Sequence, residues 1–190
     1  MKTTRFITLT ALYTALLIGV QFALSGVAGV ELVTVFFLAF CFCCGIKAGV
    51  AVAVCFSTLR CLLFGFFPTV IILYLVYYTG FALFFGFLGN KFHRKADFCA
   101  YLWCVILSTV FTAAFTLLDD AITPIFFGFG IKETQAYFYA SLPFMLTQCI
   151  CAAISVGVLF IPLSKALRVI SVDDKILSKG DENYGKKRNI

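Results

Sequence analysis

The chain has 190 residues, of which 62% are hydrophobic, 17% aromatic and only 13% charged, and its mean hydropathy is +1.03. A soluble domain of this length carries far more charge, so the composition excludes an ordinary soluble protein and predicts an integral membrane protein. The length suits one domain. The net charge of +6 needs no nucleic-acid partner, because the membrane topology derived below accounts for the basic residues.

Apolar segments recur along the chain. About 20 apolar residues span the hydrocarbon core of a bilayer, and on this measure the sequence predicts six helices, at 6–24, 30–44, 48–64, 69–88, 98–118 and 136–163. The second is short for a full crossing, and the last is long enough to extend past the membrane. Glycine, proline and polar residues predict the turns, at 45–47, 65–68, 91–95 and 119–135. Residues 1–168 therefore form the predicted membrane domain, and the charged residues 169–190 a soluble, partly disordered tail.

The positive charges lie mostly on one of the two sides that six helices define. An even number of crossings places both termini on one side, together with the turns after the second and fourth helices. All fifteen lysines and arginines except Arg60 and Lys132 fall on that side. Because cytoplasmic loops carry the excess of such residues, both termini are predicted to be cytoplasmic, in a multi-pass protein of the cell membrane.

The stretch 11–34 contains the first helix, a glycine-rich turn and the start of the second helix. Ala11 and Ala15 lie four residues apart on one helix face, and small residues at this spacing let another helix approach closely. Glu31 lies at the start of the second apolar helix. A carboxylate is tolerated there when it is solvated, paired with a cation or part of a functional site. The stretch therefore carries a candidate protein interface and a candidate binding residue.

Polar and aromatic residues concentrate toward the side predicted to be extracellular, where three turns join the six helices. Helix ends of this kind are a common place for a small-molecule pocket. A structural explanation exists for each residue as well: loop acids can be solvated, Arg60 can pair with Glu31 or extend to the headgroups, and tyrosines can form an interfacial belt. The candidate substrate-binding residues are Glu31, Thr34, Arg60, Tyr74, Tyr78, Asp119, Asp120, Gln135, Tyr139 and Gln148.

The sequence lacks the patterns of an enzyme active site or a metal site. The one histidine, His93, lies in a basic inner turn, and no G-x-S-x-G, H-E-x-x-H or phosphate-binding loop occurs. Asp119 and Asp120 are adjacent, so on a helix they point about 100° apart and do not share one proton. Most of the nine cysteines lie in apolar runs and are predicted to be small buried hydrophobes. We expect no catalysis, no metal and no cofactor.

Several features occur together in this chain: about six helices in 190 residues, the Ala11 and Ala15 pair, a glycine-rich outer turn leading into Val-Glu-Leu-Val-Thr at 30–34, Gly-Ile-Lys-Ala-Gly at 45–49 and Phe-Gly-Phe at 64–66. In this combination the chain resembles the substrate-binding S components of energy-coupling factor (ECF) transporters. The resemblance covers most of the predicted membrane domain. It implies an all-α integral membrane fold, a six-helix transmembrane bundle of the ECF S-component type.

The resemblance also implies a function. S components capture a vitamin or related micronutrient at the outer face and deliver it by toppling in the membrane against a transmembrane scaffold protein and two cytoplasmic ATPases, which together form an ABC importer. The resemblance assigns Ala11 and Ala15 to the scaffold contact and places the substrate under the loops after the first, third and fifth helices. Metal-specific members carry N-terminal histidines, which this chain lacks. The aromatic and mixed polar residues favour a flat organic ring with polar substituents as ligand.

Two alternatives remain open at this level. The chain fits a small polytopic protein that transports alone, or a non-catalytic interaction subunit of another membrane complex. A standalone carrier often has internal repeats or helices broken at mid-membrane, and neither is evident. The sequence does not name the ligand, and riboflavin, thiamine and its pyrimidine precursor, pyridoxine, folate, pantothenate, biotin and cobalamin all remain candidates.

Overall fold

The computed structural model describes residues 2–26, 32–65, 67–94 and 97–187. Five of the helices in this part of the chain are long and apolar enough to span a bilayer, and the 12-residue α2 is shorter. The protein is thus an all-α, multi-pass membrane protein, as its sequence predicts. The six helices are α1 (Lys2–Leu24), α2 (Val33–Cys44), α3 (Ile46–Phe64), α4 (Pro68–Lys91), α5 (Phe98–Phe127) and α6 (Ile131–Lys187).

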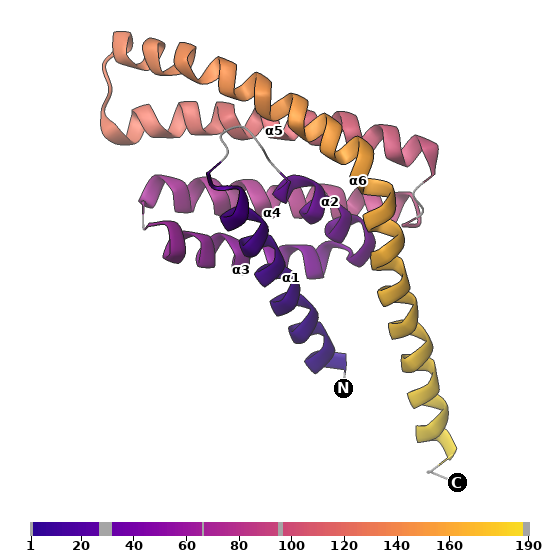
Figure 1. Cartoon of the computed structure of the whole chain (residues 1–190). Helices are drawn as coiled ribbons and strands as arrows, with labels where there is room; N and C mark the ends of the chain where they lie inside the picture. The colour runs from indigo at the N-terminus through magenta and orange to yellow at the C-terminus, as the bar shows by residue number, and fades with distance from the viewer. Residues whose placement is uncertain (1, 27–31, 66, 95–96, 188–190) are drawn as a thin grey trace.

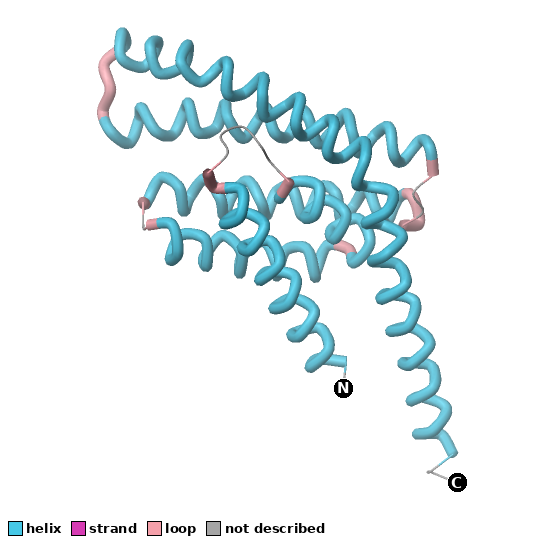
Figure 2. The backbone as a smooth tube through the Cα atoms, viewed as in Figure 1, coloured by secondary structure: helices cyan, strands magenta, loops and turns pink. Residues whose placement is uncertain are grey.

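The helices pack as two antiparallel pairs with a short helix between them (Figure 1). One pair is α3 with α4, and the other is α5 with the first part of α6. Helix α1 crosses the outside of the first pair against α3, and α2 contacts each of the other five helices. The turns after α3 and α5 lie at one end of the bundle, and the connections after α2 and α4 at the other (Figure 2). This is the alternation that the sequence predicts.

Two glycines and a proline define the ends of α2, α3 and α4. Gly45 separates α2 from α3 with a φ of +88°, and Gly65 follows α3 with a φ of +114°. Side chains with a Cβ rarely adopt these conformations, so each helix stops where its glycine stands. Pro68 lies in the first turn of α4, where its missing N–H leaves no hydrogen bond broken. The break predicted at 45–47 is confirmed at Gly45, although Ile46 and Lys47 already belong to α3, and the break predicted at 65–68 is confirmed between α3 and α4, which begins at Pro68.

The polar turn predicted at 119–135 is wrong. Helix α5 continues to Phe127 and α6 begins at Ile131, so only residues 128–130 separate them. Asp119, Asp120 and Gln135 therefore lie on helices. The reason is that the two aspartates form hydrogen bonds with α6, which lets polar residues stay inside a helix pair. Gly128, with a φ of +67°, ends α5 instead.

Helix α6 extends farther than the predicted membrane segment. It runs through Arg168 to Lys187, where the composition predicts a partly disordered tail. That stretch contains no proline, the residue that would end a helix. Within α6 stand Pro143 and Pro162, and the helix bends sharply along its length (Figure 1). Proline is the usual cause of such a bend, because it removes one backbone hydrogen bond.

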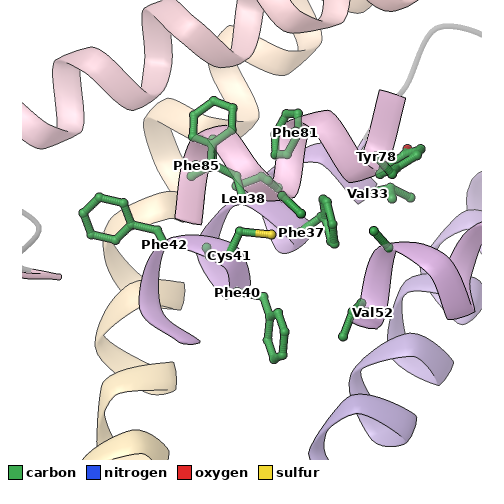
Figure 3. Close-up of a cluster of buried hydrophobic side chains, with 14 of the residues drawn as sticks. Val33, Phe37, Leu38, Phe40, Cys41, Phe42, Val52, Tyr78, Phe81 and Phe85 are labelled. Atoms are coloured by element: carbon green, nitrogen blue, oxygen red, sulfur yellow. The ribbon is translucent and has the colours of Figure 1, made fainter. Parts of the chain in front are cut away.

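The core is built mostly from completely buried aromatic rings of α2, α3 and α4, to which α6 adds Phe160. Glycines let α4 approach both α2 and α3 closely: a Cβ on Gly89 of α4 would overlap the carbonyl oxygen of Phe42 in α2, and one on Gly86 would lie 2.9 Å from the backbone of Ile46 in α3. Val33 and Tyr78 lie at one end of the cluster and Phe42 at the other (Figure 3). The largest fully buried rings are Phe37, Phe40, Phe42, Phe56, Phe81, Phe85 and Phe160.

The cysteines divide between the core and the helix surfaces. Cys41, Cys43, Cys61 and Cys104 are buried, and none of the nine cysteines, all of which lie in the described part of the chain, is in a disulfide. The interpretation of cysteine as a small buried hydrophobe is confirmed for these four. Cys55 and Cys99 are exposed on α3 and α5 instead.

Candidate functional site

A partly open cavity of about 320 Å³ lies at the end of the bundle that holds the turn between α3 and α4. Every helix contributes to its lining, α2 through Val33 at its first turn. This volume falls in the range of pockets that hold small organic molecules. The polar and aromatic side chains of the lining include Gln21, Arg60, Tyr74, Tyr78, Phe115 and Gln148.

The guanidinium of Arg60 lies over a tyrosine ring in this cavity. Its Cζ is 4.0 Å from the ring centroid of Tyr74, and 5.6 Å from that of Phe64. A cation over an aromatic face at this distance is attracted by the negative face of the ring. The Nε2 of Gln21 donates a hydrogen bond of 3.4 Å to the Tyr74 hydroxyl, so α1, α3 and α4 meet at one tyrosine.

Tyr78 forms a second part of the same wall, one helical turn after Tyr74. Its exposed fraction is 3%, and its ring centroid is 5.0 Å from that of Phe56 and 5.4 Å from that of Phe37. Both contacts are edge-on, a favourable geometry for aromatic pairs. The ring is therefore fixed by the core, and this wall of the cavity is formed before any ligand arrives.

The opposite wall comes from α5 and α6. Phe115 meets Tyr74 edge-on, with ring centroids 5.5 Å apart. The next residue on α5, Thr116, donates a hydrogen bond of 3.2 Å to Oε1 of Gln148 on α6. The bond uses the oxygen of the Gln148 amide, and Gln148 is part of the cavity lining. The cavity thus combines aromatic faces with amide, hydroxyl and guanidinium groups.

Asp119 and Asp120 form a separate polar cluster between α5 and α6. Asp119 accepts hydrogen bonds from Thr123 at 3.0 Å and from Tyr137 at 3.2 Å. Asp120 has an exposed fraction of 6% and accepts a hydrogen bond of 2.5 Å from Ser141. The two carboxylates therefore use different partners, as their adjacent positions predict. Neither is among the described residues that line the cavity.

The remaining predicted residues also lie away from the described lining. Thr34 is buried within α2, whereas Gln135 and Tyr139 are exposed on α6, Tyr139 by 70%. Glu31 lies outside the described residues. The structure thus brings together four members of the predicted set, Arg60, Tyr74, Tyr78 and Gln148, from three different helices.

The predicted partner residues are accessible. Ala11 and Ala15 are exposed on α1, whereas Tyr13, Thr14 and Leu17 of the same helix are buried. One face of α1 therefore packs in the bundle, and the described residues leave the face that carries the alanine pair uncovered.

Gln21 and Phe115 were not predicted as site residues. Gln21 had a usable signal, because a carboxamide inside an apolar helix is expensive unless it is hydrogen-bonded or functional. Phe115 had none, since it is one of 24 phenylalanines and its neighbours in sequence resemble those of many others. Only the packing of α5 against α4 places it at the cavity.

Comparison of the chain with models of protein families, with curated proteins and with solved structures finds no match. What the fold and the site define is a class: an all-α, multi-pass membrane protein with a small cavity where its helices meet.

Proposed function

We propose that the protein is the substrate-binding membrane subunit of an ECF-type importer. In this proposal it captures a vitamin or related micronutrient in the cavity at the outer end of the bundle. It then delivers the molecule by association with a transmembrane scaffold protein and two cytoplasmic ATPases. The ligand is a flat organic ring that packs on the aromatic walls and forms hydrogen bonds with the polar groups between them.

One observation carries the proposal: a cavity of about 320 Å³ to which every helix contributes, with aromatic walls and a few polar groups directed at one space. Ligand sites in helix bundles are built in this way, from side chains on facing helices. Part of the cavity is rigid, because the core holds Tyr78 on two sides. A preformed site binds a small molecule without first ordering its own side chains, which favours affinity.

The uncovered face of α1 supports the second half of the proposal. Ala11 and Ala15 are exposed and small, so a helix of another protein can approach the α1 backbone there. Association through this face leaves the cavity untouched, because α1 contributes to the lining only near its C-terminal end, through Gln21 and Leu24. Capture and delivery would then use different parts of one helix, its C-terminal end and its middle.

Native mass spectrometry of the protein purified in detergent from cells grown in rich medium tests the capture step. We expect a bound molecule of vitamin size. Gln148→Leu removes the amide from the cavity at nearly constant volume and should lose the bound mass. Gln135→Leu makes the same change on the same helix at an exposed position, and should retain it. An empty protein that shows no thermal shift with a vitamin panel would instead support an interaction subunit.

Co-purification tests the delivery step. Ala11→Leu and Ala15→Leu add bulk to the exposed face of α1 and should abolish association with a scaffold and two ATPases, while the purified protein still binds its ligand. Cys55→Leu adds similar bulk on the exposed side of α3 and serves as the matched control. Association that survives both alanine substitutions would disprove this interface.

A further inference from the structure

Arg60 is the charged side chain among the described residues that line the cavity. The other polar members of that lining, Gln21, Ser25, the two tyrosines and Gln148, are neutral groups. A cation inside a membrane bundle is costly unless it is solvated or paired with an anion. The positive charge of Arg60 therefore affects which ligands the cavity can bind.

The guanidinium has hydrogen-bonding capacity that the described part of the chain does not use. Its Nε is buried and has no hydrogen-bond partner among the described residues. The stacking on Tyr74 provides electrostatic attraction to one face of the guanidinium, but it satisfies none of the N–H groups in the plane. Those groups match a planar carboxylate, which accepts two parallel hydrogen bonds from arginine.

Gln21 adds a second unmatched group near Arg60. Its amide nitrogen donates to the Tyr74 hydroxyl, whereas its buried Oε1 has no partner among the described residues. Exchanging the nitrogen and oxygen of this amide would still leave one end without a partner. An unmatched buried amide group costs free energy that a bound ligand recovers when it supplies the missing partner.

We propose that the ligand of this cavity is a ring-bearing organic acid. Its carboxylate pairs with the guanidinium of Arg60, its ring packs against the aromatic walls, and an N–H or O–H of the ring donates to Gln21. This inference rests on the proposed capture of a small molecule and narrows it to one chemical class. An anionic lipid headgroup offers Arg60 the same oxyanion chemistry, but the aromatic lining suits a flat ring better than a flexible acyl chain.

The test measures binding of matched acids and amides to the full-length protein in detergent, by thermal shift and calorimetry. The probes are 4-aminobenzoate with its amide and biotin with biotinamide, together with whatever compound co-purifies. We expect at least one acid to bind ~100-fold more tightly than its amide, the effect of an unmatched charge in a buried pair. Arg60→Gln should remove this preference, and Arg60→Lys should retain part of it.

Several outcomes would overturn the inference. Equal binding of acids and amides would do so, as would a tight neutral or cationic ligand that Arg60→Gln leaves unaffected; the proposed capture function would survive both. A co-purified mass equal to an anionic phospholipid would identify a lipid site instead. Absence of any bound compound or thermal shift would remove the capture function and this inference together. If Arg60→Gln does not fold, the inference is still tested by comparing the preference for acids over amides in the unmodified protein and in Arg60→Lys.

Glu31 provides the control for a competing explanation. It lies outside the described residues, yet it precedes Leu32 and Val33, which line the cavity. If Glu31 neutralised Arg60, an acid would gain nothing from the guanidinium until Glu31→Gln was made. An acid preference that exists only in Glu31→Gln would therefore overturn the proposal, and a preference present before that substitution supports it.

Discussion

Two sides of this helix bundle are held together by different forces. Where α4 meets α2 and α3, Gly89 and Gly86 bring the backbones close, and buried phenylalanine rings fill the core around them. Where α5 meets α6, side-chain hydrogen bonds join the two helices. Thr116 donates to Gln148, and Tyr137 donates to Asp119. Lipid supplies no hydrophobic force between membrane helices, so close packing and interhelical hydrogen bonds are the two available sources of stability.

The cavity lies at the boundary between these regions. Arg60, Tyr74 and Tyr78 belong to the tightly packed side, and Phe115 and Gln148 to the hydrogen-bonded side. Most polar groups of the α5–α6 cluster satisfy one another, although Oδ1 of Asp120 has no partner among the described residues. Arg60 and Gln21, which line the cavity, also retain unmatched atoms among those residues. Polar residues alone therefore do not mark a ligand site; unmatched polar groups on residues that line a cavity do so better.

The largest expected effect is on the packed side. Gly89→Ala places a methyl group against the Phe42 carbonyl oxygen and forces α2 and α4 apart. We expect a loss of about 2 kcal/mol of stability, the usual cost of overpacking a core, measured as a lower melting temperature in detergent. Gly80→Ala is the matched control on α4, because a Cβ there has open space, and its melting temperature should not fall, since alanine is the better helix former. Equal effects of the two substitutions would refute the close approach.

A smaller effect is expected at the cavity wall. Phe115→Leu keeps an apolar side chain but removes the ring, and should weaken ligand binding about fivefold through the lost aromatic contact. Phe111 also packs on Tyr77 and on the α4 phenylalanines but is not among the described lining residues. Phe111→Leu should therefore lower stability without changing the dissociation constant. A larger dissociation constant in both variants would mean that the loss of affinity comes from disturbed packing rather than from lost contact with the ligand.

On the hydrogen-bonded side we expect a change in stability alone. Tyr137→Phe removes the hydrogen bond to Asp119 and should cost about 1 kcal/mol. Tyr139→Phe makes the same change at an exposed position two residues away, and should leave the melting temperature unchanged. Ligand affinity should be equal in both variants. Weaker ligand binding in Tyr137→Phe would instead indicate that Asp119 belongs to the binding site, as its position in the sequence predicts.

The smallest expected effect is at Asp120. Ser141 already has a second acceptor, the carbonyl oxygen of Phe138 at 2.9 Å, and Oδ1 of Asp120 has no partner among the described residues. Asp120→Asn should therefore change stability by less than about 0.5 kcal/mol. A much larger loss, seen by thermal melting, would show that the carboxylate holds a group which the α5–α6 cluster does not supply.

Much of the fold was predictable because it depends on local patterns. Apolar length predicted the helices, and Gly45, Gly65 and Pro68 predicted where three of them begin or end. The turn at 119–135 was misplaced because two aspartates in sequence resemble a loop. Only the partners on α6, such as Tyr137 and Ser141, reveal that they are held within a helix pair.

The cavity was predictable only in part. Arg60 and Gln148 are polar residues in apolar helices, and such residues are rare enough to be recognised one by one. Phe115 depends on how α5 rotates against α4, which is decided by contacts far apart in sequence. The same holds for Gln135 and Tyr139, which sequence placed near the cavity and which lie exposed on α6.

An experimental structure of the protein purified from rich medium is the most direct test of the central claim. The account predicts density for a ring-bearing acid between the walls formed by Tyr78 and Phe115, with its carboxylate against Arg60. A cavity filled by side chains, or a small molecule bound elsewhere on the bundle, would contradict it.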